Sequence, residues 1–219
     1  MVRRFVVLLV MATLAASCGL GQSSDPPASL KSRVKVSYIL GYENLTDQIL
    51  DADLVVLGTA ADVETVGVNR YDDGSGVTDR TMGITVHIDE VLRSSGVVEA
   101  TAGTEIRIST IQPYDMAIHE VRGRILLDNP GIWFLLDSNS LRRRLGQDLG
   151  EESVLVFQNG SALALRDGAD SVEYILPLRR FSGTFEAYLE TVQTAAGKVA
   201  DMPQPERPLG LPDGWGEGK

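Results

Sequence analysis

The sequence has little cysteine, little histidine and a shortage of basic residues, and each shortage excludes a class of function. One Cys in 219 residues allows no internal disulfide, and with two His it cannot build a zinc site from soft ligands alone. The 30 acidic residues against 20 basic ones give a formal charge of −10, which is unsuited to gripping a phosphate backbone. We therefore expect no nucleic-acid partner, and only carboxylate-rich metal sites stay open.

The composition is otherwise that of a chain that folds around a core, with 43% hydrophobic and 23% charged residues. Wholesale disorder is thereby excluded. We expect one β-rich globular domain over residues 34–200. Prolines and glycines interrupt residues 201–219 every few positions, which predicts a disordered tail. Trp215 in that tail is a candidate docking point for a partner, or an inert aromatic residue.

The first residues have the layout of an export signal. Arg3 and Arg4 precede an apolar run over residues 5–14, and the small residues 15–17 follow it. About ten strongly apolar residues are too few to span a bilayer as a mature helix, which needs about 20. The pattern predicts a signal peptide at residues 1–17 that is removed on export.

Cys18 follows these small residues directly, and Leu-Ala-Ala-Ser-Cys-Gly at 14–19 resembles the lipobox of bacterial lipoproteins. The resemblance implies that Cys18 becomes a diacylated first residue, carrying fatty acids such as palmitate, at the outer face of a bacterial membrane. Two acyl chains supply the two signals that stable anchoring requires. Ala15 stands where the family usually has Leu. A plain secretory cleavage site and a twin-arginine signal stay open as alternatives.

A flexible tether is predicted after the anchor, since residues 18–33 are small, polar and proline-containing. It would let the folded domain stand away from the membrane.

Hydrophobic periodicity predicts a mainly β (α+β) fold. Continuous apolar runs predict buried strands at 52–59 and 131–136, whereas alternation predicts half-buried strands at 84–89 and 105–109. A short helix at 46–51 and an amphipathic helix at 185–199 should begin and end the domain. Strands that no helices divide pair antiparallel, so we expect a small OB-like barrel or a sandwich.

Asn159-Gly160 lies between two apolar runs and predicts a type I′ hairpin. Pairing across this turn would place Val156 opposite Leu163. A further strand at 172–176 should return after the turn at Asp167-Gly168.

Four phrases together resemble the netrin-module OB-type barrel, which also occurs in tissue inhibitors of metalloproteinases. They are residues 52–59, 85–92, 106–110 and 131–136, and the resemblance covers 46–137. It implies a barrel. It implies no inhibitory activity, because the animal inhibitors chelate zinc through an N-terminal Cys that disulfides hold in place, whereas Cys18 is expected to be acylated.

The acidic loop around Gly74 is a candidate calcium site, but it lacks the spacing of an EF-hand and its closing Glu, which favours a solvated loop instead. Its oxygen ligands would come from Asn69, Asp72, Asp73 and Asp79.

Three other groups of residues are candidates for a chemical role. His119-Glu120 begins like a zincin motif, but Gly123 stands where the second His is required. The basic run 142–144 could touch anionic lipid or wall polymer, or be a solvated turn. His87 with Asp89 and Glu90 could form an acid–base group, but adjacent strand residues alternate faces, so His87 should point to solvent.

These patterns assign no catalytic residue, no cofactor and no metal site. We expect a lipid-anchored protein of the bacterial cell envelope that acts as a non-catalytic binding or interaction module. Its partners would be the membrane, through Cys18, and an envelope protein or polymer. The alternative is an extracytoplasmic hydrolase that uses carboxylates.

Overall fold

The computed structural model describes residues 41–42, 44–70, 78–111, 117–125, 129–158, 163–167, 171–174 and 183–211. Its strands are β1 (Leu54–Arg70), β2 (Thr78–Ser94), β3 (Glu105–Ile111), β4 (Gly131–Asp137), β5 (Leu155–Phe157), β6 (Leu163–Asp167) and β7 (Ser171–Tyr174). Its helices are α2 (Leu45–Asp51), α3 (Ile118–Ile125), α4 (Ser138–Arg144) and α5 (Phe185–Val199).

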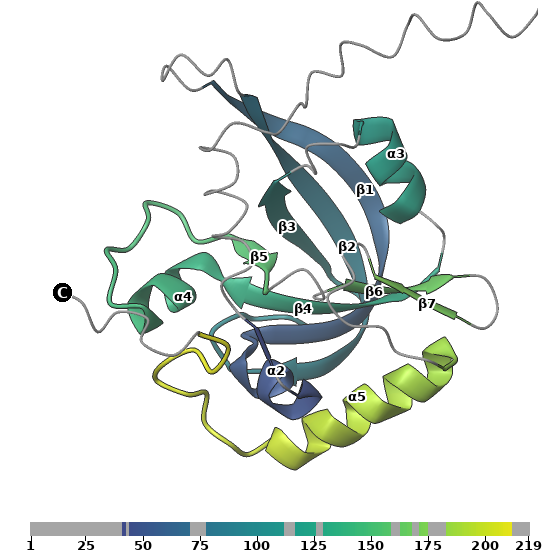
Figure 1. Ribbon diagram of the computed structural model, residues 1–219, viewed down its shortest axis with the longest axis vertical. Helices are drawn as coiled ribbons and strands as arrows, with labels where there is room; N and C mark the ends of the chain where they lie inside the picture. The colour runs from purple at the N-terminus through teal and green to yellow at the C-terminus, as the bar shows by residue number, and fades with distance from the viewer. Residues whose placement is uncertain are drawn as a thin grey trace, which may run out of the picture.

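Five strands close into a barrel in the order β1-β2-β3-β5-β4, with β4 returning to β1 (Figure 1). Neighbouring strands are antiparallel except β3 and β5, which run parallel and meet at Ile108 and Leu155. The expectation of a mainly β domain built on a small OB-like barrel is confirmed. β6 and β7 extend the sheet outward from β4.

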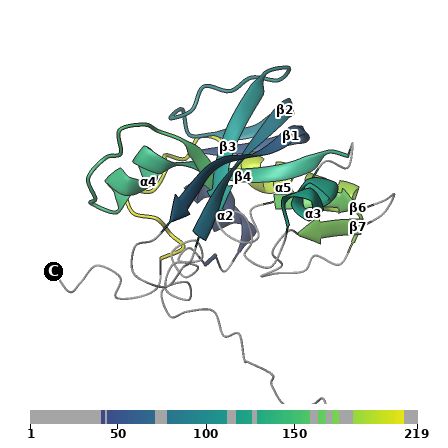
Figure 2. The same ribbon diagram turned by 90° about the horizontal axis from the view of Figure 1, so that it is seen from above.

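The inside of the barrel is filled by alternate residues of its strands. Val56, Ile84 and Ile108 are fully buried there, and the Trp133 indole donates a hydrogen bond of 2.8 Å to the carbonyl of Gly58. Val121 and Ile125 of α3 belong to the same cluster. This helix thus packs onto the barrel core, and Figure 2 shows it on the opposite side of the barrel from α4.

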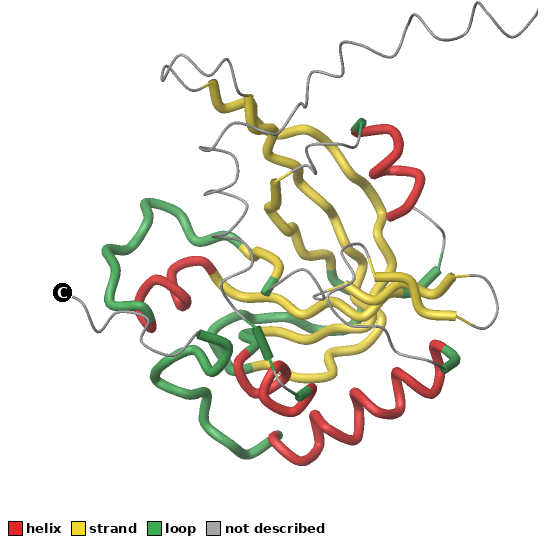
Figure 3. Tube along the Cα trace, in the orientation of Figure 1, coloured by secondary structure: helices red, strands yellow, loops and turns green. Residues whose placement is uncertain are grey.

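A second apolar layer lies outside the barrel, where α2 and α5 cover β1 and β4 (Figure 3). Ile132 and Phe134 of β4 share one buried cluster there with Phe185 and Val192 of α5. Since both faces of β4 are covered, the continuous apolar run at 131–136 is explained. The two predicted helices are confirmed, and α2 is capped by Asn44, which accepts a 2.8 Å hydrogen bond from the Asp47 amide.

The predicted hairpin is wrong. β5 and β6 both lie on the edge of β4 opposite β1, where Phe157 pairs with Leu135 and Leu163 pairs with Trp133. The other edge of β5 is taken by β3, so Val156 faces Leu136 rather than Leu163. β5 and β6 each pair with β4, which is longer and apolar, rather than with each other across the predicted turn. The turn at Asn159-Gly160 itself lies outside the described residues.

β6 and β7 do pair antiparallel, as expected of the strand that follows the Asp167-Gly168 turn. β1 and β2 are much longer than the sequence indicated. Each has 17 residues, and their pairing is shifted by irregularities at four points. Polar and glycine-containing stretches beyond the barrel hid this extension from a hydrophobicity pattern.

The C-terminal expectation is wrong for residues 201–211. They contain neither helix nor strand, yet Pro208 and Gly210 are buried and the Gly210 carbonyl accepts a 2.7 Å hydrogen bond from the Gly41 amide. Specific contacts with the domain replace the missing regular structure. Residues 212–219, with Trp215, and residues 1–40, with Cys18, lie outside the described residues. In the described part of the chain, no helix is both long and apolar enough to cross a bilayer.

Candidate functional site

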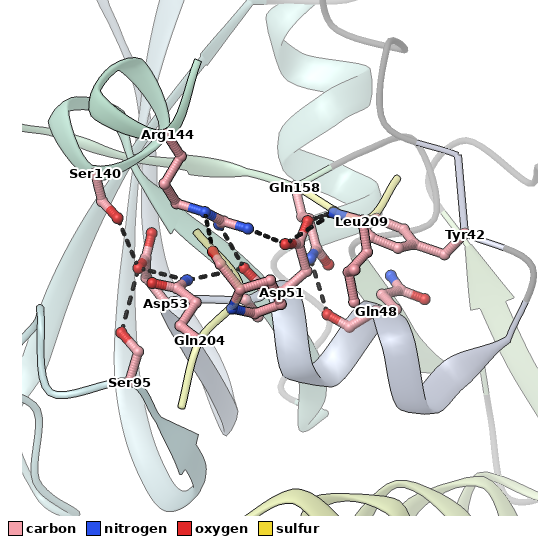
Figure 4. A network of polar contacts seen from close by, with 12 residues as sticks. Tyr42, Gln48, Asp51, Asp53, Ser95, Ser140, Arg144, Gln158, Gln204 and Leu209 are labelled. Atoms are coloured by element: carbon pink, nitrogen blue, oxygen red, sulfur yellow. Dashed lines mark hydrogen bonds and ion pairs between the residues drawn. The ribbon is translucent and has the colours of Figure 1, made fainter. Parts of the chain in front are cut away.

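Two aspartates are buried where α2 passes into β1. Asp51 is the last residue of the helix and Asp53 immediately precedes the strand, and both are fully buried. Charged side chains are almost never fully buried unless they are paired. At this junction the two carboxylates are held in a network of hydrogen bonds and an ion pair (Figure 4).

Asp51 binds groups from three parts of the chain. Its Oδ1 forms an ion pair with Arg144 of α4 and accepts a 3.2 Å hydrogen bond from the Leu209 amide. Its Oδ2 accepts a 2.5 Å hydrogen bond from the Tyr42 hydroxyl. Arg144 also donates to the carbonyl of Asp51 and, through Nε, to that of Pro205, both at 3.0 Å.

Asp53 is held by four donors. Its Oδ1 accepts hydrogen bonds from Ser95 (3.2 Å), Ser140 (3.0 Å) and Gln204 (2.9 Å). Its Oδ2 accepts from the backbone amide of Asp137 at 2.9 Å. The donors come from the segment after β2, from α4, from the C-terminal segment and from the end of β4.

Burial sets the electrostatics of this network. It raises the pKa of Tyr42 far above its ordinary value of 10.0, and the neighbouring Asp51 carboxylate adds to this effect. Burial also lowers the pKa of Arg93, an effect that Asp53 and Asp51 partly offset. Arg93 donates a 2.7 Å hydrogen bond to the Ala52 carbonyl. Two carboxylates and two guanidinium groups thus balance in charge.

The arrangement of this network fits a role in stabilising the fold. Each carboxylate oxygen of Asp51 and Asp53 already accepts at least one hydrogen bond, and neither side chain is exposed. A general base or nucleophile must instead come within hydrogen-bond reach of the substrate, and both carboxylates are fully buried. The network joins the ends of the domain to α4 and the barrel.

The outer face of β1, β2 and β3 carries exposed polar and charged side chains. We call it the β1–β3 face and define it by Thr59, Glu64, Thr85, His87, Glu105 and Arg107. His87 pairs with Thr59 on one side and with Glu105 on the other. The Arg107 guanidinium contacts Glu64 at 2.5 Å, and both side chains are more than half exposed.

Gly83 makes this pair possible. A Cβ at this position would lie 3.0 Å from two guanidinium nitrogens of Arg107 and 2.9 Å from Val66 Cγ1. The arginine therefore lies directly over β2 on its way to Glu64. Val66 beside it is 45% exposed, so an apolar side chain adjoins the two charges.

Of the three predicted acid–base residues, His87 and Asp89 both lie beside Thr59, whereas Glu90 does not. His87 is exposed on β2, as expected, and Asp89 accepts a 3.3 Å hydrogen bond from Thr59. Glu90 instead turns to α5, where Gln193 donates to it at 3.2 Å. His119 is exposed on α3, one turn before Gly123.

The three arginines at 142–144 differ in exposure. Arg142 and Arg143 are exposed, whereas Arg144 points inward to Asp51. In the candidate calcium loop, Asn69 pairs with Asp79 across β1 and β2, and Asp72, Asp73 and Gly74 lie outside the described residues. Among the residues whose placement is described, no three His, Cys, Asp or Glu side chains gather to hold a metal ion.

Sequence reasoning missed the buried network. Asp51 and Asp53 flank Ala52 directly before a continuous apolar strand, and two acidic residues at such a boundary are the one signal that was available. Their partners Tyr42, Arg144 and Gln204 are distant in sequence, and no periodicity connects them.

Comparison with models of known protein families and with curated protein sequences finds no match for this chain.

Proposed function

We propose that this chain is a lipid-anchored protein of the bacterial cell envelope and that its barrel is a non-catalytic binding module. The anchor is supported by the apolar run at 5–14 and by the single Cys at the lipobox-like position 18. The binding role is supported by the β1–β3 face. The partner would be an envelope protein or polymer.

The position of the β1–β3 face on the barrel carries this proposal. By analogy with other OB barrels, the face of the second and third strands is where ligands bind. Here that face presents Arg107 and Glu64 from rigid strands, with exposed Val66 next to them. Charges of both signs beside an apolar side chain fit a partner with a mixed surface, and side chains fixed on strands bind with little loss of entropy.

A relation to the netrin module is part of the same proposal. The strand order β1-β2-β3-β5-β4, with α3 between β3 and β4, agrees with an OB barrel, which is what the resemblance over 46–137 implies. This agreement supports a shared architecture. It gives no support to protease inhibition.

The anchor is tested by replacing Cys18→Ser in cells fed an alkyne-labelled fatty acid. We expect the wild-type chain to carry the label, and the variant to stay unlabelled at the size of the precursor. Equal labelling of the two chains would contradict lipidation at Cys18.

The binding face is tested by photo-crosslinking in cells. A photoreactive residue at His87, on the β1–β3 face, should form adducts with an envelope component, whereas one at exposed Thr194 of α5 should not. Arg107→Glu should weaken the His87 adduct because it reverses a charge on that face. Adducts of equal yield from both positions, or from Thr194 alone, would refute the assignment of this face.

A further inference from the structure

Residues 203–211 cross the buried network without helix or strand, with bends at 206–207 and a turn at 209–210, and we call this segment the strap. Figure 1 shows it leaving the end of α5 and running past α2 toward α4. Its hydrogen bonds are those by which proteins bind a polypeptide backbone. Asp51 accepts from the Leu209 amide, Arg144 donates to the Pro205 carbonyl and Gly41 donates to the Gly210 carbonyl.

One side chain of the strap is recognised as well. The Gln204 amide donates to Asp53 Oδ1 at 2.9 Å and to the Asp51 carbonyl at 3.0 Å. At the other end Gly210 lies against the Tyr42 ring, and a Cβ there would come within 2.9 Å of two ring carbons and 3.1 Å of the Gly41 nitrogen. The surface below the strap therefore favours a glutamine at one position and a glycine six residues later.

The surface below the strap combines charged groups with a small apolar cluster of Tyr42 and Leu136, against which Leu211 of the strap packs. It is lined by Asp51, Asp53, Arg144 and Tyr42, and we call it the trough. Water can hydrate these groups when the strap lifts, so opening exposes much less apolar surface than the loss of a core helix would. Leu209 of the strap is itself 45% exposed.

The sequence of the strap also favours binding as a separate segment. Prolines occupy positions 203, 205 and 208, and each restricts the conformations of the free chain. A segment with fewer free conformations loses less entropy when it binds.

We propose that the trough is a binding site for a polypeptide segment with the pattern of the strap, and that it is filled in cis by residues 203–211 and can take the strap of a second copy of this chain. The second copy is the occupant because its strap has the same glutamine, prolines and glycine at the same spacing. Exchange of a terminal segment between identical chains needs no new contact. The inference is independent of the proposed function.

The test uses the full chain and a labelled peptide of residues 203–211. Gly210→Ala should push the chain's own strap out of the trough, because the added Cβ meets Tyr42 and the Gly41 backbone. Gly197→Ala is the matched control, since a Cβ at that helical glycine has no atom within 4 Å. Faster hydrogen exchange at residues 203–211 in Gly210→Ala alone would show that the strap is released.

Fluorescence anisotropy then measures the peptide on each chain. We expect binding to the Gly210→Ala chain at least about tenfold tighter than to the wild type or to Gly197→Ala, whose troughs are filled. A peptide with Gln204→Ala should bind about tenfold or more weakly, because a hydrogen bond to a buried carboxylate is lost. A peptide that carries Gly210→Ala should not bind.

The results that overturn the proposal are distinct. Released straps without peptide binding would mean that the trough works only in cis. Equal binding of the wild-type and Gln204→Ala peptides would show that the trough does not read the strap. If hydrogen exchange shows that Gly210→Ala unfolds the whole domain, the wild-type chain is used instead. An excess of the peptide should then displace the chain's own strap and speed hydrogen exchange at residues 203–211. Unchanged exchange there would refute the proposal.

Discussion

Arg144→Met should destabilise the protein by about 3–5 kcal/mol, because it leaves the Asp51 carboxylate buried without its cation. The Arg144 side chain is 7% exposed and that of Asp51 is 0% exposed, so water cannot replace the lost partner. Removing one member of a buried pair typically costs this much. Methionine retains most of the side-chain volume, so the effect reports the charge and hydrogen bonds rather than a cavity.

The matched control is Arg122→Met. Arg122 also forms an ion pair, with Asp62 at 2.9 Å, but both side chains are 50% exposed. An exposed pair of this kind contributes about 0–1 kcal/mol. The two substitutions remove the same chemical group, and they differ in the burial of the partner left behind.

Urea unfolding followed by circular dichroism measures both effects. With a slope of about 2 kcal/mol per molar urea, Arg144→Met should lower the midpoint by roughly 2 M, and Arg122→Met by less than about 0.5 M. Adding Asp51→Asn to Arg144→Met should recover part of the loss, since a neutral amide is less costly to bury than an unpaired carboxylate. Equal shifts in the two single variants, or a double variant less stable than Arg144→Met, would refute this reasoning.

Three further predictions concern individual residues. Stability should fall as pH rises above 10, because the unfolded chain releases a Tyr42 proton that the folded chain retains; the advantage of wild type over Tyr42→Phe in urea should shrink by roughly 1 kcal/mol between pH 10 and 11, and a constant difference would count against it. Gly58→Ala should cost more than about 2 kcal/mol in the same assay, because its Cβ would clash with the backbone carbonyl oxygen of His87, and an unchanged midpoint would contradict that contact. Replacing both His87 and His119 with Gln should change stability by no more than about 0.5 kcal/mol and leave the metal content by mass spectrometry unchanged, since both side chains are exposed; loss of a stoichiometric metal would revive an enzymatic reading.

The parts of the fold that follow from periodicity could be predicted. The continuous apolar run at 131–136 indicates a strand buried on both faces, and the alternation at 84–89 indicates a strand buried on one face. Both strands form where the patterns predict them. The error at Asn159-Gly160 arose because a local turn preference cannot show which strand edge is free. β4 offered its edge to β5 and β6, and that competition depends on the closed barrel.

The buried network could not be predicted for a related reason. Asp51 is stabilised by Tyr42 nine residues before it, by Arg144 on a different helix and by the Leu209 amide near the end of the domain. Each partner looks like an ordinary surface residue in its own neighbourhood. The triple arginine illustrates this, because exposure of Arg142 and Arg143 and burial of Arg144 depend on the turn of α4 against the barrel.

β4 is buried on both faces, and this couples the unfolding of the two apolar clusters. Trp133 and Leu135 belong to the interior cluster, while Ile132 and Phe134 belong to the cluster beneath α5, so one short strand supplies both. Neither cluster can come apart without pulling the other's side chains into water. Heating should therefore give one transition seen at the same temperature by the fluorescence of a Trp215→Phe variant, which reports Trp133, and by the helical circular dichroism signal, to which α5 contributes the longest described helix. A weakening of either layer lowers the melting temperature of the whole molecule.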